Sequence, residues 1–302
     1  MMPGLLGETL AVLSALSFAM FNIVISGTKR SRADNGVLFS VVVTIGFSFA
    51  LFVVLEAGRL DLSASKDTAM GIGSFAFAGI AAMVFGRTLV FDSIRRLGAT
   101  RASAVKRLNP FFSVLLAAFF LSEVVTRYDF FGLIVIALAF GLLVQDSFRK
   151  SEDSVAPPKP IAYVIGASAA LAYAISYIGR KAGLNFMDAP ALGTFISALS
   201  GLIGFAAISI FSERYRTMFR NLFRDIDRHI VAASILVSMG QILMFAALAY
   251  EKVSTVVMIS SLEVFFSIFL STVIFRIEKR PRALVFLAAA LAIVGVLLIA
   301  KS

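Results

Sequence analysis

The chain has 302 residues, 59% of them hydrophobic and only 15% charged, and its mean hydropathy is +0.93. A water-soluble surface does not tolerate this composition, so a soluble domain is excluded and we expect a polytopic membrane protein. The formal net charge is +10, but the basic residues are scattered between apolar blocks, which indicates membrane anchors rather than nucleic-acid binding. With no Cys and a single His, His229, the chain lacks side chains for disulfides, thiolate chemistry or a histidine metal cluster, and we expect neither metal nor cofactor.

Ten apolar blocks follow one another along the chain, each near the ~20 residues that a helix needs to cross a bilayer. Lipid offers backbone groups no partners, and the blocks are too long and too uniformly apolar for barrel strands, so we predict an all-α fold of ten transmembrane helices. No basic segment precedes the first block, which we therefore take as a membrane helix and not a cleavable signal. The blocks are 5–27, 37–57, 69–92, 99–121, 128–145, 161–182, 190–211, 229–249, 254–275 and 281–300.

The most polar stretch runs from Gln145 to Pro160, and its prolines prevent a continuous helix. It separates a first repeat, 1–147, from a second, 161–302, with a linker at 148–160. At an offset of 154 residues, eight of the 32 positions in 86–117 are identical between the halves, against about three expected by chance. Five helices per copy is an odd number, so the copies should enter the membrane in opposite senses, as two inverted repeats.

Loop charges predict the orientation. Counted with the block ends that flank them, the odd-numbered loops hold 18 Lys and Arg residues, whereas the even-numbered loops and the two ends hold seven. The positive-inside rule then makes the odd loops cytoplasmic and places both termini outside. In the odd loop 214–228, Arg residues recur every four positions with apolar residues opposite them, which is typical of an interfacial helix on an anionic inner leaflet. A solvated charged loop is the alternative.

The run GRTLVFDSIRRLGATRASAVKRLNPFFSVLLAAFFLSE (86–123), followed by Gly132 and Gly141, resembles the second half of an EamA-type repeat of the drug/metabolite transporter superfamily. The segment from Gln241 to Glu278, with Gly295, is similar to a second copy, and AYAISYIGRKA (172–182) to the start of that copy. The resemblance implies a ten-helix carrier or exporter of small metabolites such as amino acids, sugars or nucleotides.

Two features depart from that family. The central proline of the first copy, Pro110, is replaced by Val264 in the second, so the two inner helices are expected to bend differently. The resemblance also implies cytoplasmic termini, whereas the charge count places the termini outside. One of these two predictions must be wrong.

Ionisable residues within a span cost ~2.5–3.5 kcal/mol on insertion scales, so each needs a reason. Glu263 lies nine residues past Ser254, about 13–14 Å deep and near the midplane. At the repeat offset, the equivalents of Glu263, Lys106 and Arg87 are Asn109, Ser260 and Gln241.

These polar residues form stripes at helical spacing, which should face each other or a shared wet cavity. The stripes are Lys106, Asn109, Ser113 and Ala117; Ser260, Glu263, Ser267 and Ser271; Tyr173, Ser176, Tyr177 and Arg180; and, more weakly, Ser14, Ser17 and Asn22.

The functional interpretation is a central cavity in which Arg87 and Lys106 bind a carboxylate or phosphate, and Glu263 pairs with Lys106 or binds an amine. The structural alternative is an internal Lys106–Glu263 or Arg87–Asp92 ion pair that only determines packing. The candidate substrate-binding residues are Lys106, Glu263, Arg87, Asn109, Gln241, Ser260, Ser113, Ser267, Tyr173 and Tyr177.

We therefore expect a secondary-active transporter in the bacterial inner membrane that exports a small anionic or zwitterionic metabolite by rocking one repeat against the other. Protons are a candidate coupling ion. For the oligomeric state, both a monomer and a homodimer are compatible with the sequence. The alternatives are a flippase for a lipid-linked anion and a non-transporting structural subunit. An enzyme is not expected, because no His-based catalytic pattern accompanies the serines, and a channel would need a ring of selectivity groups.

Overall fold

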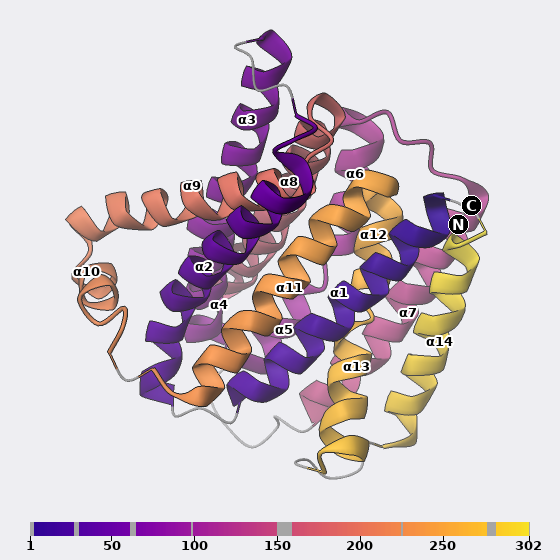
Figure 1. Ribbon diagram of the computed structural model, residues 1–302. Helices are drawn as coiled ribbons and strands as arrows, with labels where there is room; N and C mark the ends of the chain where they lie inside the picture. The colour runs from indigo at the N-terminus through magenta and orange to yellow at the C-terminus, as the bar shows by residue number, and fades with distance from the viewer. Residues whose placement is uncertain are drawn as a thin grey trace.

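The computed structural model describes residues 3–26, 30–60, 65–97, 99–149, 159–224, 226–276 and 282–301. Every regular element within these ranges is helical, and long helices run roughly side by side through the molecule (Figure 1). Eight helical segments are long and apolar enough to cross a membrane, which confirms an all-helical, multi-pass membrane protein. Most of the predicted linker, residues 150–158, lies outside the described residues.

The helices of the first half are α1 (Pro3–Ser26), α2 (Arg30–Leu51) with the π-helical turn η1 (Phe52–Glu56), α3 (Lys66–Gly79) with η2 (Ile80–Gly86), α4 (Arg87–Leu97), α5 (Ala99–Lys106), α6 (Asn109–Phe120) and α7 (Arg127–Arg149). Those of the second half are α8 (Pro160–Phe186), α9 (Pro190–Phe211), α10 (Glu213–Arg220), α11 (Arg228–Tyr250), α12 (Val253–Ser260), α13 (Glu263–Phe269) with η3 (Leu270–Ile274), and α14 (Ala283–Ile299).

Two predicted segments fall outside the eight spans. The block 99–121 is divided into α5 and α6, and the block 281–300 contains the 17-residue α14, which is short for a membrane crossing. Both segments are helical, and the expected total of ten crossings stays a prediction.

The fourth and ninth predicted helices are interrupted at equivalent positions. The turn at Arg107–Leu108 separates α5 from α6, and the turn at Ser261–Leu262, 154 residues later, separates α12 from α13. The backbone angles agree closely: φ −68° and ψ −14° at Leu108, against φ −64° and ψ −16° at Leu262. Because only the first copy has a proline there, the interruption does not depend on proline. The helices after the two breaks do differ farther along, since α13 continues into the π-helical η3 whereas α6 is α-helical to its end.

A second backbone feature repeats at the same offset. Ser122 and Arg276 are the non-glycine residues with positive φ, at 55° and 53°, within the described part of the chain. Each follows the helix that continues from an interruption. Two such coincidences in backbone conformation support the internal duplication that eight sequence identities indicated.

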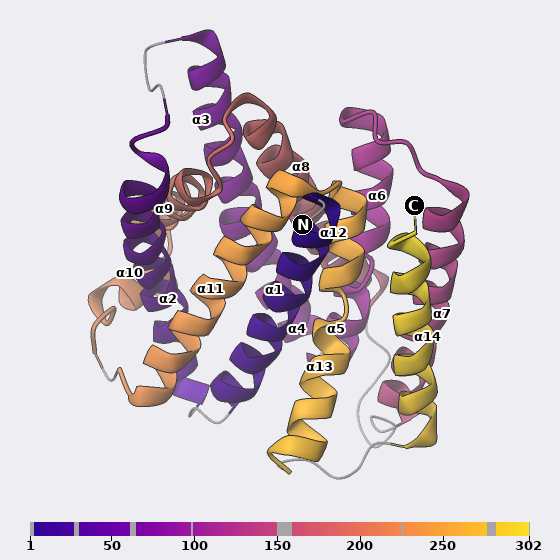
Figure 2. The same ribbon diagram turned by 45° about the vertical axis from the view of Figure 1, so that its right-hand side comes forward.

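Most of the close helix packing joins one half of the chain to the other. Helix α1 packs on α11, α2 on α9 and α11, α3 on α8, α6 on α8 and α12, and α7 on α14. The first and last helical residues lie at the same end of the molecule in both views (Figures 1 and 2). At the α7–α14 crossing a Cβ on Gly132 would come within 2.8 Å of the Gly295 carbonyl oxygen, so only glycine permits this approach.

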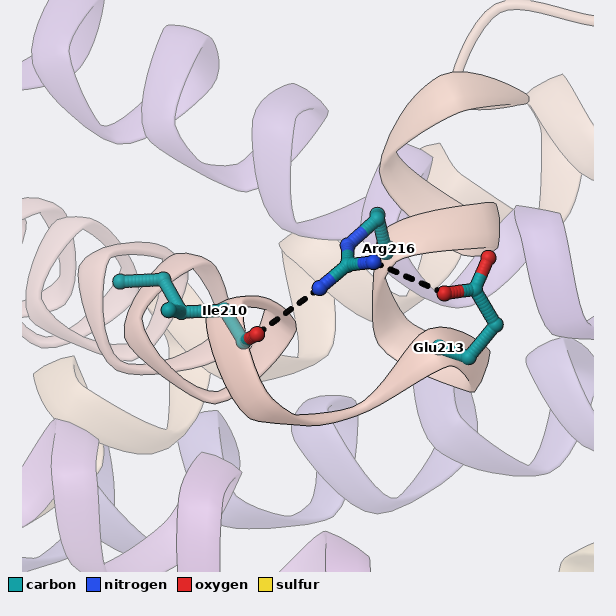
Figure 3. Close-up of polar contacts among 3 residues, drawn as sticks. All are labelled: Ile210, Glu213 and Arg216. Atoms are coloured by element: carbon teal, nitrogen blue, oxygen red, sulfur yellow. Dashed lines mark hydrogen bonds and ion pairs between the residues drawn. The ribbon is translucent and has the colours of Figure 1, made fainter.

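Helix α10 is shorter than the predicted interfacial segment 214–228. It ends at Arg220, and residues 221–224 form a turn. Arg216 donates to the Glu213 carboxylate at 2.9 Å and to the Ile210 carbonyl at 2.8 Å, which ties α10 to the end of α9 (Figure 3). Met218 is buried against Leu38 and Phe205, so one face of α10 packs on the bundle.

Several helix ends are capped by charged side chains from elsewhere in the chain. The Glu123 carboxylate accepts the N–H groups of Val253 at 2.6 Å and Ser254 at 3.1 Å, at the start of α12. Glu56 accepts the N–H groups of Ala191 and Leu192 at 2.8 and 2.9 Å, at the start of α9.

The end of α11 is capped by a cation. The Lys181 ammonium donates to the carbonyls of Leu248 and Glu251, at 2.7 and 3.0 Å. Carboxylates at helix N-termini and an ammonium at a C-terminus match the sign of the helix dipole and satisfy backbone groups that have no intrahelical partner. The sequence also places Glu123 and Glu278 at helix ends, where a boundary or capping role is expected; Glu123 is a capping residue, and Glu278 lies outside the described residues.

We predict that Val264→Pro will be tolerated. Val264 is in the first turn of α13, where backbone N–H groups have no intrahelical acceptor, and Pro110 occupies the equivalent place in α6. The expected cost is below about 1 kcal/mol, against about 3 kcal/mol or more for Val256→Pro, which removes the bond from the Val256 N–H to the Lys252 carbonyl. Thermal unfolding of the purified variants in detergent measures the difference, and equal losses would contradict the prediction.

We also predict that Glu123→Gln will destabilise the protein by about 1–3 kcal/mol, because a neutral amide has a single acceptor oxygen for the end of α12. The matched control is Glu213→Gln. The Glu213 side chain is 72% exposed and pairs only with Arg216, so its replacement should change stability by less than about 0.5 kcal/mol. Apparent melting temperatures of both variants provide the test, and a smaller effect at Glu123 than at Glu213 would refute it.

Candidate functional site

Helix α8 presents one polar face to the interior of the bundle. Tyr173, Tyr177 and Arg180 follow at intervals of four and three residues, so their side chains lie on the same face. Helices α3, α4, α5, α6 and α11 all pack against α8. Side chains on this face therefore meet residues from both halves of the chain.

Lys106, the last residue of α5, lies against this face. Its Nζ is 5.5 Å from the centroid of the Tyr173 ring, a cation–π distance. The ring in turn packs against Gly86, where an added Cβ would come within 3.1 Å of it. Lys106 as a whole residue is nevertheless exposed, so the ring does not cover all of its side chain.

Glu263 occupies the equivalent break in the second half, as the first residue of α13. Its Oε1 accepts a hydrogen bond of 2.7 Å from the Asn22 side-chain amide on α1. The same amide nitrogen lies 3.5 Å from the Ser267 hydroxyl. The predicted weak stripe on the first helix thus supplies the direct partner of Glu263.

The equivalent residues are placed in parallel ways. Asn109 is the first residue of α6 and accepts a 3.0 Å hydrogen bond from the buried Ser113. The Ser260 hydroxyl, at the end of α12, lies 3.6 Å from the Met244 sulfur. Polar side chains at both breaks therefore flank the interrupted backbone.

Neither of the two structural ion pairs considered from the sequence forms in the described part of the chain. Glu263 bonds to Asn22, and Asp92 pairs with Arg96 at 2.9 Å. Lys106 still lies close enough to Glu263 and Tyr177 to interact with them electrostatically. Lys106 and Glu263 thus share one region without neutralising each other by direct contact.

A cleft lies beside this region, between α2, α3, η2, α8, α9 and α11. Its free space is about 240 Å³, including its open side. The lining residues are Thr44, Gly79, Ala82, Met83, Arg180, Thr194, Ser197, Ala198, Gln241 and Phe245. Gln241 is the one predicted binding residue among them.

Arg180 is buried in the wall of the cleft, with 5% of its surface exposed. The guanidinium carbon lies 4.8 Å from the Phe245 ring centroid and 5.4 Å from that of Tyr177. We placed Arg180 on the α8 stripe from the sequence but did not include it among the binding residues. The sequence feature that could have identified Arg180 as a binding residue is the presence of an arginine within an apolar block.

The remaining candidate, Arg87, begins α4 directly after η2. Its Nη1 is buried and has no hydrogen-bond partner within the described residues. Arg87 begins the helix α4 that packs on α8, one residue after Gly86, which contacts the Tyr173 ring. The described residues contain no group of three His, Cys, Asp or Glu side chains that could hold a metal ion. This region can therefore bind a ligand through hydrogen bonds and charge.

Comparisons with known proteins agree with this architecture. A solved structure described as "Crystal structure of protein" matches with a TM-score of 0.73 and 14% identity, and the match covers 97% of this chain and 96% of the other. At this identity the likeness shows the fold alone. A comparison with curated protein sequences gave no match.

The family comparison is decisive for the class of protein. The model of the EamA-like transporter family matches the chain twice, over residues 5–145 and again over 160–301. Two copies cover nearly the whole chain, and the many apolar helices are those of a transmembrane transport protein. The chain therefore belongs to the EamA-like transporter family.

Proposed function

We propose that this transporter moves a small anionic or zwitterionic organic metabolite by alternating access. The observation that carries the proposal is the pair of interrupted helices, with Lys106 just before one break and Glu263 just after the other. Interrupted helices whose ends reach the membrane interior are a recurring way to place polar groups at a substrate site. An ammonium and a carboxylate in one region match the two charges of a zwitterion.

Positive charge outweighs negative charge in this region, which favours an anionic group on the substrate. Lys106, Arg87 and Arg180 lie on or next to the polar face of α8, whereas Glu263 already accepts a hydrogen bond from Asn22. The other proposed contacts are Asn109, Ser113, Ser260, Ser267, Gln241, Tyr173 and Tyr177, all of which lie at the breaks, on α8 or in the cleft wall.

The repeated breaks and positive-φ residues support an internal duplication, and five helices in each copy would insert the two copies in opposite senses. The packing, however, argues against rocking of one intact repeat against the other, because the major contacts join helices of different halves. We propose instead that each moving body combines helices from both repeats. The α7–α14 pair, closed by Gly132 and Gly295, is one such unit.

For the setting we propose a bacterial inner membrane, export as the direction, and contact of the segment 214–228 with an anionic leaflet. The exposed Arg216, Arg220 and Arg224 support that contact. Protons stay a candidate coupling ion through Glu263.

The proposal predicts that Lys106→Gln will lower substrate uptake at least about tenfold, because one charged contact is lost. The measurement is counterflow in liposomes containing the purified protein, with labelled carboxylates, phosphate esters and amino acids as solutes. The melting temperature should stay within about 2 °C of the wild type, since Lys106 makes no ion pair in the described structure.

Lys66→Gln is the matched control, because Lys66 is exposed at the start of α3 and distant in sequence from both breaks. It should transport like the wild type. If no solute is carried by the wild type, or if Lys106→Gln transports normally, the proposal fails.

A further inference from the structure

Arg180 is a buried cation without a counter-ion. No carboxylate pairs with it in the described residues, and its Nε makes no hydrogen bond there. The rings of Tyr177 and Phe245 compensate part of the cost of burying the charge. A buried charge that lacks a partner in the protein destabilises the fold, so its retention at a cleft indicates a partner that comes from outside.

The polar groups around Arg180 leave two hydrogen-bond donors for a ligand. The hydroxyls of Ser197 and Thr194 already donate to the carbonyls of Phe75 and Pro190, both at less than 3 Å. Gln241 also lines the cleft, and its side-chain amide has no hydrogen bond within the described residues. Arg180 and Gln241 are therefore the two donors in the cleft that remain for an acceptor group of a ligand.

The shape and remaining walls of the cleft restrict the ligand further. A guanidinium offers parallel N–H groups that match the two oxygens of a planar carboxylate. Ala82, Met83 and Ala198 form an apolar wall beside these donors. The enclosed part of the cleft has room for little more than a water molecule, so it admits an acceptor group such as a carboxylate, and the rest of a ligand would lie toward the open side.

Arg180 and Lys106 are linked by the polar face of α8. Tyr173, beneath Lys106, and Arg180 are seven residues apart, which is about 10 Å along the helix. Tyr177 lies between them and interacts electrostatically with both cations. Lys106 is exposed and Arg180 is buried, so of the two cations on this helix face Arg180 is the inner, more enclosed one.

We propose that Arg180 is a second, inner anion-binding residue that takes the carboxylate of a small organic substrate after contact with Lys106. This inference rests on the proposed transport function and identifies its substrate class as carboxylates. Gln241 orients the carboxylate, and the apolar wall holds the carbon chain.

The test uses thermal unfolding of the full-length protein in detergent with sodium acetate, pentanoate or succinate, or with L-norvaline. Sodium chloride and butylamine hydrochloride are the ionic controls. In the wild type at least one carboxylate should raise the melting temperature by about 2 °C or more, and butylamine should not. In Arg180→Met the carboxylate shift should disappear, with binding weakened about 30-fold or more.

A second readout separates binding from a structural role. Without ligand, Arg180→Met should melt at or above the wild-type temperature, because it removes an unpaired buried charge. Arg180→Lys keeps the charge but loses the paired donors, and should retain a reduced carboxylate shift. A structural arginine would instead melt lower when replaced and leave the carboxylate shift unchanged, which would overturn the inference.

Arg107→Met is the matched control. Arg107 is also a poorly exposed arginine over an aromatic ring, 5.3 Å from the Phe140 centroid, with a buried Nη1 that has no hydrogen bond. It does not line the cleft, so its variant should keep the full carboxylate shift. Loss of the shift in both variants would contradict a specific role of Arg180.

The outcome also distinguishes this inference from the proposed function. If liposomes transport a solute but no carboxylate shifts the wild-type melting temperature, the Arg180 site is wrong and transport stands. If carboxylates bind through Arg180 but no solute crosses the membrane, the site stands and the transport proposal is wrong.

Discussion

Unpaired backbone groups inside an apolar medium are the constraint on which the rest of this structure depends. Two membrane helices are interrupted, at Arg107–Leu108 and Ser261–Leu262, and each break creates helix ends whose N–H and C=O groups need partners. Tight turns meet part of this need, because the Leu108 N–H bonds to the Val105 carbonyl and the Leu262 N–H bonds to the Ile259 carbonyl. In the described residues the N-cap side chains of α6 and α13 make no hydrogen bond to these helix starts, so the polar side chains beside the breaks can bind a solute instead.

Helix ends at one side of the molecule also need partners for their unpaired backbone groups, and charged side chains provide these partners. Glu56 and Glu123 cap the starts of α9 and α12, and Lys181 caps the end of α11. Glu56 and Glu123 of the first half cap helices of the second half, whereas Lys181 joins two helices of the second half. Because the dominant helix pairs also cross between halves, the two repeats are interleaved and neither forms a separate domain. A transport cycle must preserve most of these contacts, which limits which groups of helices can move together.

The charges inside the bundle are stabilised mainly by aromatic rings. Lys106 lies over Tyr173, and Arg180 lies between Tyr177 and Phe245. A ring lowers the cost of burying a cation but does not neutralise it, so the cation keeps its attraction for an anion. A direct ion pair with Glu263 would have cancelled that attraction. The Asn22 amide, which satisfies Glu263 without adding charge, leaves Lys106 available.

Composition and hydrophobic block length were sufficient to predict a multi-pass helical protein, because the lack of water in lipid leaves few alternatives to a helix. Eight identities at one offset, including Phe111 and Phe112, were sufficient to reveal the duplication. The sequence also placed Lys106, Asn109 and Glu263 on helical stripes, because side-chain direction follows the 3.6-residue period.

Only the tertiary structure showed which side chains the polar stripes contact. No periodicity shows that Glu263 bonds to Asn22, 241 residues away, or that Val264 permits the same break as Pro110. Nor does a sequence distinguish a paired arginine from the unpaired Arg180, because pairing depends on which helices pack against α8. The spacing of polar side chains is a property of one helix, whereas the partner of a buried charge is determined by several helices packed together.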